Sequence, residues 1–286
     1  MAINVRNWEN ENRKIISEKG MFRVLEHQTD LSVNHMSAEQ AYFASKMGVK
    51  LRQVEITLDG TQNVKTQAGS MQMMLGNIMM ETGVTSAKGF LGSMLNAAVT
   101  NETAVKPTYS GNGQVILEPT YKHIILQNVA DWTGGLVIED GMFLASEGSV
   151  NHTVIQNTQD LGTALLSSEG LYNLSFTGTG VVALESLVPF EELVEYELQD
   201  DVLKVDGNMA VCWSGSLKFS VEKTTKSLLG SLASGEGLVN VYRGTGKVWV
   251  SPVAGTKQSA PKTMSSSTTT TKETSSGGGL LSALLG

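Results

Sequence analysis

The densest group of side chains that could do chemistry is an acidic run within residues 191–201. Its carboxylates are Glu191, Glu192, Glu195, Glu197, Asp200 and Asp201. Two carboxylates held at a fixed separation can serve as acid and base in glycoside hydrolysis, so a carbohydrate or small-molecule enzyme is one hypothesis. A solvated strand face with its adjoining loop has the same composition, and we favour this second interpretation.

The histidines give a weaker indication of chemistry. His27 and His35 stand eight residues apart with Asp30 between them, and imidazole and carboxylate groups are ligands of zinc. Their spacing lacks the tight i, i+4 arrangement that would strengthen this case, so we predict no metal site. His123 and His152 lie in β-like runs, where a place on a strand face explains them.

The single cysteine, Cys212, occupies a repeat position that is apolar elsewhere in the chain. We interpret it as a small buried residue rather than as a nucleophile. No arrangement of Ser, His and Asp stands out, although such a triad can assemble from distant residues. The sequence therefore predicts no catalytic residue, no cofactor and no metal ligand.

The composition argues against several classes of protein. The 286 residues include 41% hydrophobic residues, 30 glycines and only 17% charged residues, which favours a turn-rich β protein with a proper core. The net charge of −7 and the lack of a Lys/Arg cluster make nucleic-acid binding unfavourable. The start has no apolar signal segment, and no apolar run approaches the roughly 18 residues of a spanning helix. We expect a cytoplasmic protein, at most peripheral to a membrane.

Two glycine landmarks repeat along the chain in the same order. The first is a Gly-x-Gly motif followed by an apolar run, and it begins at Gly111, Gly178 and Gly244. The second is a single glycine soon after a Gly-x-Met or Gly-Met-Phe motif, found at Gly76, Gly148 and Gly215. The repeats predict three β units at about residues 51–119, 120–186 and 187–252, each of about 66 residues.

Each Gly-x-Gly motif lies between two β-prone runs, such as residues 172–176 and 181–184. Glycine readily supplies the positive φ of a tight turn, so we predict a hairpin at each motif. A dinucleotide-binding loop would have to open a helix, whereas β-branched residues follow here.

These motifs resemble the Altered-Inheritance-of-Mitochondria-24 family over about residues 51–252. The matching residues are Gly69-Ser70-Met71, Gly141-Met142-Phe143-Leu144-Ala145-Ser146, Gly235-Glu236-Gly237-Leu238 and Gly244-Thr245-Gly246-Lys247-Val248-Trp249-Val250. The resemblance implies a compact all-β sandwich or prism of three pseudo-symmetric units, similar to the tryptophan-RNA-binding attenuation protein. It also implies homotrimers in bacterial members and a link to mitochondrial inner-membrane organisation in eukaryotic ones. No catalytic residues come with the family.

The two ends depart from the family pattern. Residues 1–50 form an N-terminal extension, in which residues 21–26 suggest a strand and residues 37–47 a helix that starts with a capping box at Ser37 and stops at Gly48. Together these could form a lid on the β body or a loosely attached arm. Residues 254–286 are rich in Ser, Thr and Gly, and we predict a disordered tail with an apolar end.

Apolar side chains in mid-unit loops and in the tail are our candidate interface residues, because loops are normally polar. They are Phe90, Leu91, Met94, Leu95, Leu228, Leu229, Leu232, Leu281, Leu284 and Leu285. The alternative is that the loops fold back onto the core as short helices and that the tail is inert.

The favoured function is that of a non-enzymatic, homo-oligomeric β scaffold, most simply a trimer, with a protein partner or a membrane surface as its further contact. An RNA-binding β ring, suggested by the fold analogy alone, is an alternative that the acidic charge disfavours. The carbohydrate or small-molecule enzyme remains the third hypothesis.

Overall fold

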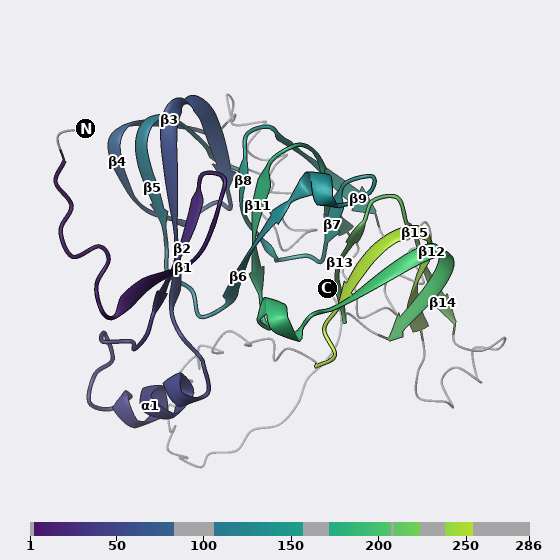
Figure 1. The fold of residues 1–286 in the computed structure, drawn as a ribbon, viewed down its shortest axis with the longest axis horizontal. Helices are drawn as coiled ribbons and strands as arrows, with labels where there is room; N and C mark the ends of the chain where they lie inside the picture. Colours follow the sequence, from purple (N-terminus) through teal and green to yellow (C-terminus); the bar gives the residue numbers. More distant parts are fainter. Residues whose placement is uncertain (1–2, 83–105, 157–171, 207–208, 224–237, 254–286) are drawn as a thin grey trace, which may run out of the picture. The chain divides into compact units, whose positions relative to one another are not determined.

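The computed structural model describes residues 3–82, 106–156, 172–206, 209–223 and 238–253 (Figure 1). Within these ranges the chain is almost entirely β, with the helix α1 (Ala38–Lys46) and two 3-10 turns, η1 (Val129–Asp131) and η2 (Phe190–Glu192). The all-β class predicted from the sequence is confirmed. Both sheets belong to one compact unit, Met1–Gly255.

The first sheet has eight antiparallel strands among the described residues. Their order is β1-β2-β3-β8-β11-β6, and β5 pairs with both β3 and β4. The strands are β1 (Arg13–Lys19), β2 (Phe22–His27), β3 (Arg52–Thr66), β4 (Met71–Glu81), β5 (Thr108–Leu117), β6 (His123–Asn128), β8 (Phe143–Glu147) and β11 (Val181–Ser186).

The second sheet has seven antiparallel strands in the described part of the chain. Their order is β12-β15-β13-β7-β10-β9, and β14 pairs with β15. The strands are β7 (Leu136–Ile138), β9 (Val150–Gln156), β10 (Tyr172–Gly178), β12 (Val194–Asp206), β13 (Ala210–Ser214), β14 (Lys218–Lys223) and β15 (Leu238–Val250).

The core follows from alternation along the strands. Val54, Ile56 and Leu58 occupy every second position of β3, so their side chains point to one face, and all three are buried. They belong to one apolar cluster with Val115 and Leu117 of β5. Two further clusters are centred on aromatic side chains of the later strands, and include Phe143, Phe176 and Trp249 in one and Trp213 and Tyr242 in the other.

The N-terminal extension is part of the first sheet rather than a lid or a loose arm. β2 pairs along its length with β3, and Val24 lies opposite Val54. The side chains of Phe22, Val24 and Leu25 are fully buried. Because this hairpin supplies core residues, the boundary expected at residue 50 does not separate two structural bodies.

Helix α1 lies within the range predicted for it, but its predicted capping box does not form. Ser37 occupies the N-cap position without a side-chain cap hydrogen bond. Its φ of −104° and ψ of −1° are helical, whereas a capping side chain requires an extended backbone to reach the first turn. Gly48, with a φ of +78°, follows the C-cap residue Met47 and ends the helix as predicted.

The Gly-x-Gly motifs are not hairpin turns, and this prediction was wrong. Gly111 and Gly244 lie inside the continuous strands β5 and β15, whose two halves pair with the same neighbour on both sides of the glycines. Gly178 ends β10, and β11 then continues in the other sheet. The glycines permit close approach without reversing the chain, since a Cβ at Gly111 would lie 2.1 Å from the Asn77 carbonyl oxygen.

Candidate interaction surface

Three stretches of the chain, each containing one Gly-x-Gly motif, pair their strands in the same register. An aromatic residue two positions before each Gly-x-Gly motif lies opposite an apolar residue of an earlier strand: Tyr109 with Val64, Phe176 with Leu136, and Tyr242 with Leu203. A valine two positions after each motif also has a matching partner: Val115 with Met74, Val182 with Ser146, and Val248 with Trp213. Equivalent positions can therefore be assigned residue by residue.

Two junctions join these stretches, and they share a register. At the first junction β3 pairs with β8, and Lys65 lies opposite Ser146. At the second, β7 pairs with β13, and Val137 lies opposite Trp213. Lys65 and Val137 are equivalent positions, as are Ser146 and Trp213. The flanking pairs follow the same register. At the first junction they are Val64 with Glu147 and Thr66 with Ala145. At the second they are Leu136 with Ser214 and Ile138 with Cys212.

The register leaves one edge unpaired in the first stretch and one in the third. Among the described residues β4 pairs only with β5, and β12 pairs only with β15 (Figure 1). In this register Met74 of β4 is equivalent to Ser146 and Trp213, and Lys204 of β12 is equivalent to Lys65. We call residues 71–75 the β4 edge and residues 202–206 the β12 edge.

Side chains at the second junction are buried, whereas the equivalent side chains of the β4 edge are exposed. Trp213 and Cys212 at the second junction are 1% and 0% exposed, whereas the equivalent Met74 and Met73 of the β4 edge are 42% and 39% exposed. The β4 edge reads Met-Gln-Met-Met-Leu and carries no charge. Soluble proteins usually protect an edge strand with charges, proline or a bulge. β4 has a register shift between Met71 and Met73, but β8 and β13 have the equivalent shift and still pair across their junctions. The exposed and uncharged β4 edge is therefore a candidate contact surface.

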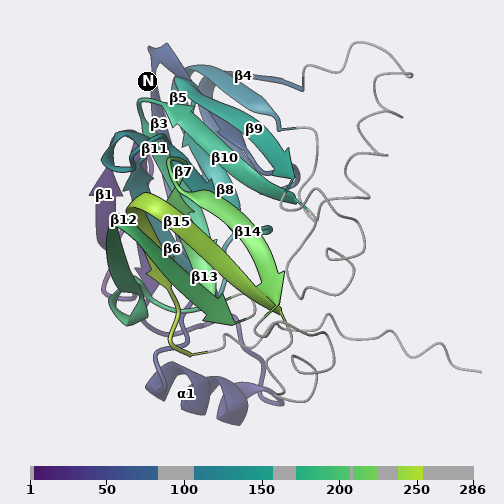
Figure 2. The same cartoon turned by 90° about the vertical axis from the view of Figure 1, so that its right-hand side faces the viewer.

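The interface residues predicted from the sequence all lie outside the described residues. They fall in residues 83–105, 224–237 and 254–286, so the prediction stays untested. The structure does describe the strand ends beside these segments and beside residues 157–171. Glu81 pairs with Thr108, Gln156 with Tyr172, and Lys223 with Leu238. Figure 2 shows β4, β9 and β14 running towards one side of the view.

The β4 edge was not among the residues predicted from the sequence. Its signal was present in the second glycine landmark, because the residues before Gly76 align with those before Gly148 and Gly215. That alignment sets Met73 and Met74 against positions that are small or buried in the other stretches. Only the strand pairing shows that, among the described residues, no strand covers these methionines as β3 and β7 cover their equivalents.

The acidic run extends along β12 from the turn η2. Glu195 accepts a hydrogen bond from Trp249 Nε1 at 2.8 Å and lies 3.5 Å from Lys247 Nζ. Asp200, with a φ of +54°, lies at the irregularity of β12 opposite Gly244 and Gly246. Asp201 follows Glu195 by six positions along the strand, about 20 Å at 3.3 Å per residue, so the run as a whole does not converge at one point.

The histidine with the largest change in acidity is His152. Its Nε2 lies 2.7 Å from Ser146 Oγ, and its ring packs edge-on against Phe143 and Phe176. Burial lowers the pKa of His152 to about 3, and the nearby charge of Lys65 acts in the same direction. An imidazole that stays neutral and packs between aromatic rings acts as a part of the core.

Two other groups considered for chemistry, Cys212 and Asp30, have surroundings that give them structural roles. Cys212 is fully buried, and burial with the charge of Glu139 raises the pKa of its thiol. Asp30, expected between the two N-terminal histidines, accepts hydrogen bonds from Ser32 and Tyr121. In the described part of the chain no three His, Cys, Asp or Glu residues come close enough to hold a metal ion.

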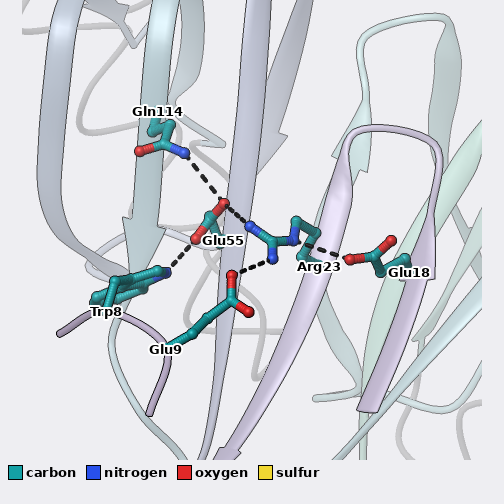
Figure 3. Close-up of polar contacts among 6 residues, drawn as sticks. All are labelled: Trp8, Glu9, Glu18, Arg23, Glu55 and Gln114. Atoms are coloured by element: carbon teal, nitrogen blue, oxygen red, sulfur yellow. Dashed lines mark hydrogen bonds and ion pairs between the residues drawn. The ribbon is translucent and has the colours of Figure 1, made fainter. Parts of the chain in front are cut away.

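A buried carboxylate ties the N-terminal segment to the first sheet (Figure 3). Glu55 of β3 has a side chain that is only 1% exposed, and it accepts hydrogen bonds from Arg23 at 2.8 Å, from Gln114 at 3.1 Å and from Trp8. Arg23 also pairs with Glu9 at 2.6 Å, as well as with Glu18. Burial opposes the charge of Arg23, but its hydrogen bonds to Glu9, Glu55 and Glu18 raise its pKa.

This network is an anchor rather than a reactive centre. The guanidinium satisfies the buried carboxylate, as a buried charge requires. The indole of Trp8 and the carboxylate of Glu9 fix the segment before β1 against the β3–β5 face. A groove of about 660 Å³ runs beside it, lined by residues that include Val5, Trp8 and Asn112.

Comparison with known proteins assigns the chain to a family. A family model described as mitochondrial biogenesis AIM24 matches residues 43–253. The chain belongs to the AIM24 family. The match covers β3 to β15 and so includes both junctions and both free edges of this AIM24 protein. The resemblance inferred from the glycine motifs is thereby confirmed.

A solved structure supports the same fold. The X-ray structure of protein SPYM3_0169 from Streptococcus pyogenes is similar with a TM-score of 0.53 and 22% identity. The similarity covers 72% of this chain and 89% of the streptococcal chain. At this identity the likeness supports the fold alone. The chain has no significant match among curated proteins.

Proposed function

We propose that this AIM24 protein is a non-enzymatic scaffold that works as a homo-oligomer, most simply a homotrimer. The observation that carries the proposal is the β4 edge, an uncharged strand edge whose methionines occupy positions that are buried at the internal junctions. Burying apolar surface contributes about 25 cal/mol per Å², so two exposed methionines on a strand edge give association a driving force.

The non-enzymatic part of the proposal rests on what the conspicuous side chains do. Glu195 is held by Trp249 and Lys247, and His152 is packed between aromatic rings. Cys212 is buried in the core, where its thiol is inert. These groups stabilise the sheets, and a scaffold needs nothing more from them.

We place the scaffold in the cytoplasm, with peripheral contact to a membrane or a protein partner. In the described residues no helix has both the length and the apolar character needed to cross a bilayer. The apolar residues expected to make the peripheral contact are those of the mid-unit loops and the tail, among them Leu91, Leu229 and Leu284.

Light scattering of the purified chain at micromolar concentration tests the proposal. We expect a mass that is a multiple of 30.6 kDa, with three copies as the simplest case. Met73→Lys should reduce the mass to that of one chain, because lysine is a charge that protects natural edge strands. Val154→Lys is the matched control, since Val154 is 56% exposed on β9, a strand that also ends its sheet but lies outside the β4 and β12 edges. A wild-type mass of 30.6 kDa would reject the homo-oligomer.

A further inference from the structure

The residues of the β4 edge and the β12 edge could form a third junction like the two internal ones. If β12 met β4 in the register of the two internal junctions, Lys204 would lie opposite Met74. The flanking pairs would then be Leu203 with Leu75 and Val205 with Met73. Alternate residues of a strand share a face, so these four apolar side chains would all lie on one face.

The charge on the β12 edge also fits this register. Lys65, the equivalent of Lys204, crosses the first junction and donates hydrogen bonds to the Val150 carbonyl oxygen at 2.9 Å and the Gly148 carbonyl oxygen at 3.4 Å. Gly76 and Ile78 hold the equivalent positions after the β4 edge. Within its own chain Lys204 Nζ lies 3.9 Å from Glu222, in an exposed ion pair that contributes little. It can exchange that partner for the carbonyl acceptors of an incoming β4 strand, so its charge does not prevent pairing.

The two edges do not meet within one chain. β4 lies in the first sheet and β12 in the second, and among the described residues neither pairs beyond its own neighbour. We infer that the β4 edge of one chain pairs antiparallel with the β12 edge of a second copy, in the register Met74 opposite Lys204. This inference rests on the proposed homo-oligomer and names its interface.

Such an interface is heterologous, because the two surfaces in contact are different. Each copy then pairs its β4 edge with one neighbouring copy and its β12 edge with another, so copies join head to tail. A set of copies whose rotation closes forms a ring in which no β4 or β12 edge stays unpaired, and each additional contact stabilises the closed set. A symmetric pairing of two β4 edges would instead leave both β12 edges free.

Disulfide cross-linking between two variants tests the register. Met74→Cys and Lys204→Cys chains are purified separately, mixed under mild oxidation, and their linked peptides identified by mass spectrometry. Directly opposed residues have Cα atoms about 4.5–5.5 Å apart, within the range that a disulfide spans. The control replaces Lys204→Cys with Val202→Cys, which lies two residues out of register. Met74 and Lys204 are exposed, so neither substitution should disturb folding, and Leu75→Cys with Leu203→Cys gives a second pair.

We expect the 74–204 link to form at least about tenfold more than the 74–202 link, a difference that the diagonal separation of about 7–8 Å supports. A 75–203 link would confirm the register independently. An oligomeric mass without either in-register link, or with 74–74 links instead, would overturn this interface and leave the homo-oligomer standing. A single-chain mass would overturn both, and would leave the β4 edge to be covered by another part of the same chain.

Discussion

Trp213 of β13 lies directly opposite Val137 of β7, and each side chain is at most 2% exposed. This pair closes the second junction, and its equivalent at the first junction is Ser146 opposite Lys65. The same backbone register thus places a tryptophan opposite a valine at one junction and a serine opposite a lysine at the other. The register is a property of the repeated strand pairing and not of one pair of side chains.

Trp213→Ala should destabilise the protein by about 3–5 kcal/mol, because it leaves a large cavity in a packed core. Trp213 also packs against Phe219 and Tyr242, whose ring contacts would be lost. Chemical denaturation followed by circular dichroism measures the change. Met74→Ala at the equivalent exposed position is the control, and it should cost the monomeric fold less than about 1 kcal/mol. Equal losses for the two variants would contradict the assignment of Trp213 to a buried junction.

Gly113→Ala should weaken the β4–β5 pairing. A Cβ at Gly113 would lie 2.0 Å from the Leu75 carbonyl oxygen, and backbone has little room to move away. We expect a loss of about 1–3 kcal/mol in unfolding free energy, with increased hydrogen exchange in β4. Gly69→Ala is the control, because its φ of +79° costs only local strain and nothing lies within 4 Å of the added carbon. An unchanged stability of Gly113→Ala would show that this close approach is absent.

Glu55→Gln should destabilise the N-terminal segment by about 1–3 kcal/mol, because the buried acceptor of three hydrogen bonds loses its charge. Arg23 would keep Glu9 and Glu18, so the sheet itself should remain folded. Limited proteolysis before β1, together with the change in Trp8 fluorescence, measures the effect. Glu18→Gln removes an exposed partner of the same guanidinium and should cost less than about 1 kcal/mol. Equal effects of the two variants would show that Glu55 does not anchor the segment.

The stability of the protein should fall as the pH is lowered from about 6.5 towards 3. Burial holds the pKa of folded His152 at about 3, below the ordinary value of 6.5, so only the unfolded chain takes up this proton in that range. Each such proton contributes a slope of at most about 1.4 kcal/mol per pH unit. His27 and His123, whose pKa values burial also lowers, add to the slope.

A substitution isolates the contribution of His152 to this pH dependence. His152→Gln should flatten the dependence of unfolding free energy on pH below 6.5 and leave it unchanged above 6.5. His35→Gln, at an exposed position, is the matched control and should keep the wild-type slope. A wild-type slope in His152→Gln would show that other groups carry the effect.

The sequence predicted the all-β class and the family because both depend on local and repeated features. The glycines after Tyr109, Phe176 and Tyr242 mark equivalent positions, and a fixed spacing reveals them without any structure. Their role was misread as hairpin turns, because a positive φ permits both a reversal and a bend within a strand. Which of the two occurs depends on pairing with β3, β4 and β12, which is not local.

The β4 edge was harder to predict for a similar reason. Met73 and Met74 look like ordinary core residues of a strand, since Ala145 and Cys212 at the equivalent position are buried. Their exposure arises because β4 has a partner strand on one side only within the described part of the chain. The attachment of β2 to β3 likewise depends on pairing across 30 residues, beyond the reach of a motif.

Amide hydrogen exchange at the two edges, followed over a dilution series, tests most directly whether they meet between copies. Edge amides that gain a partner strand exchange more slowly, because they become hydrogen-bonded. We predict that peptides covering residues 71–75 and 202–206 become protected together as concentration rises, while the β9 peptide at residues 150–155 does not change. Protection that is independent of concentration, or confined to one of the two edges, would contradict the account.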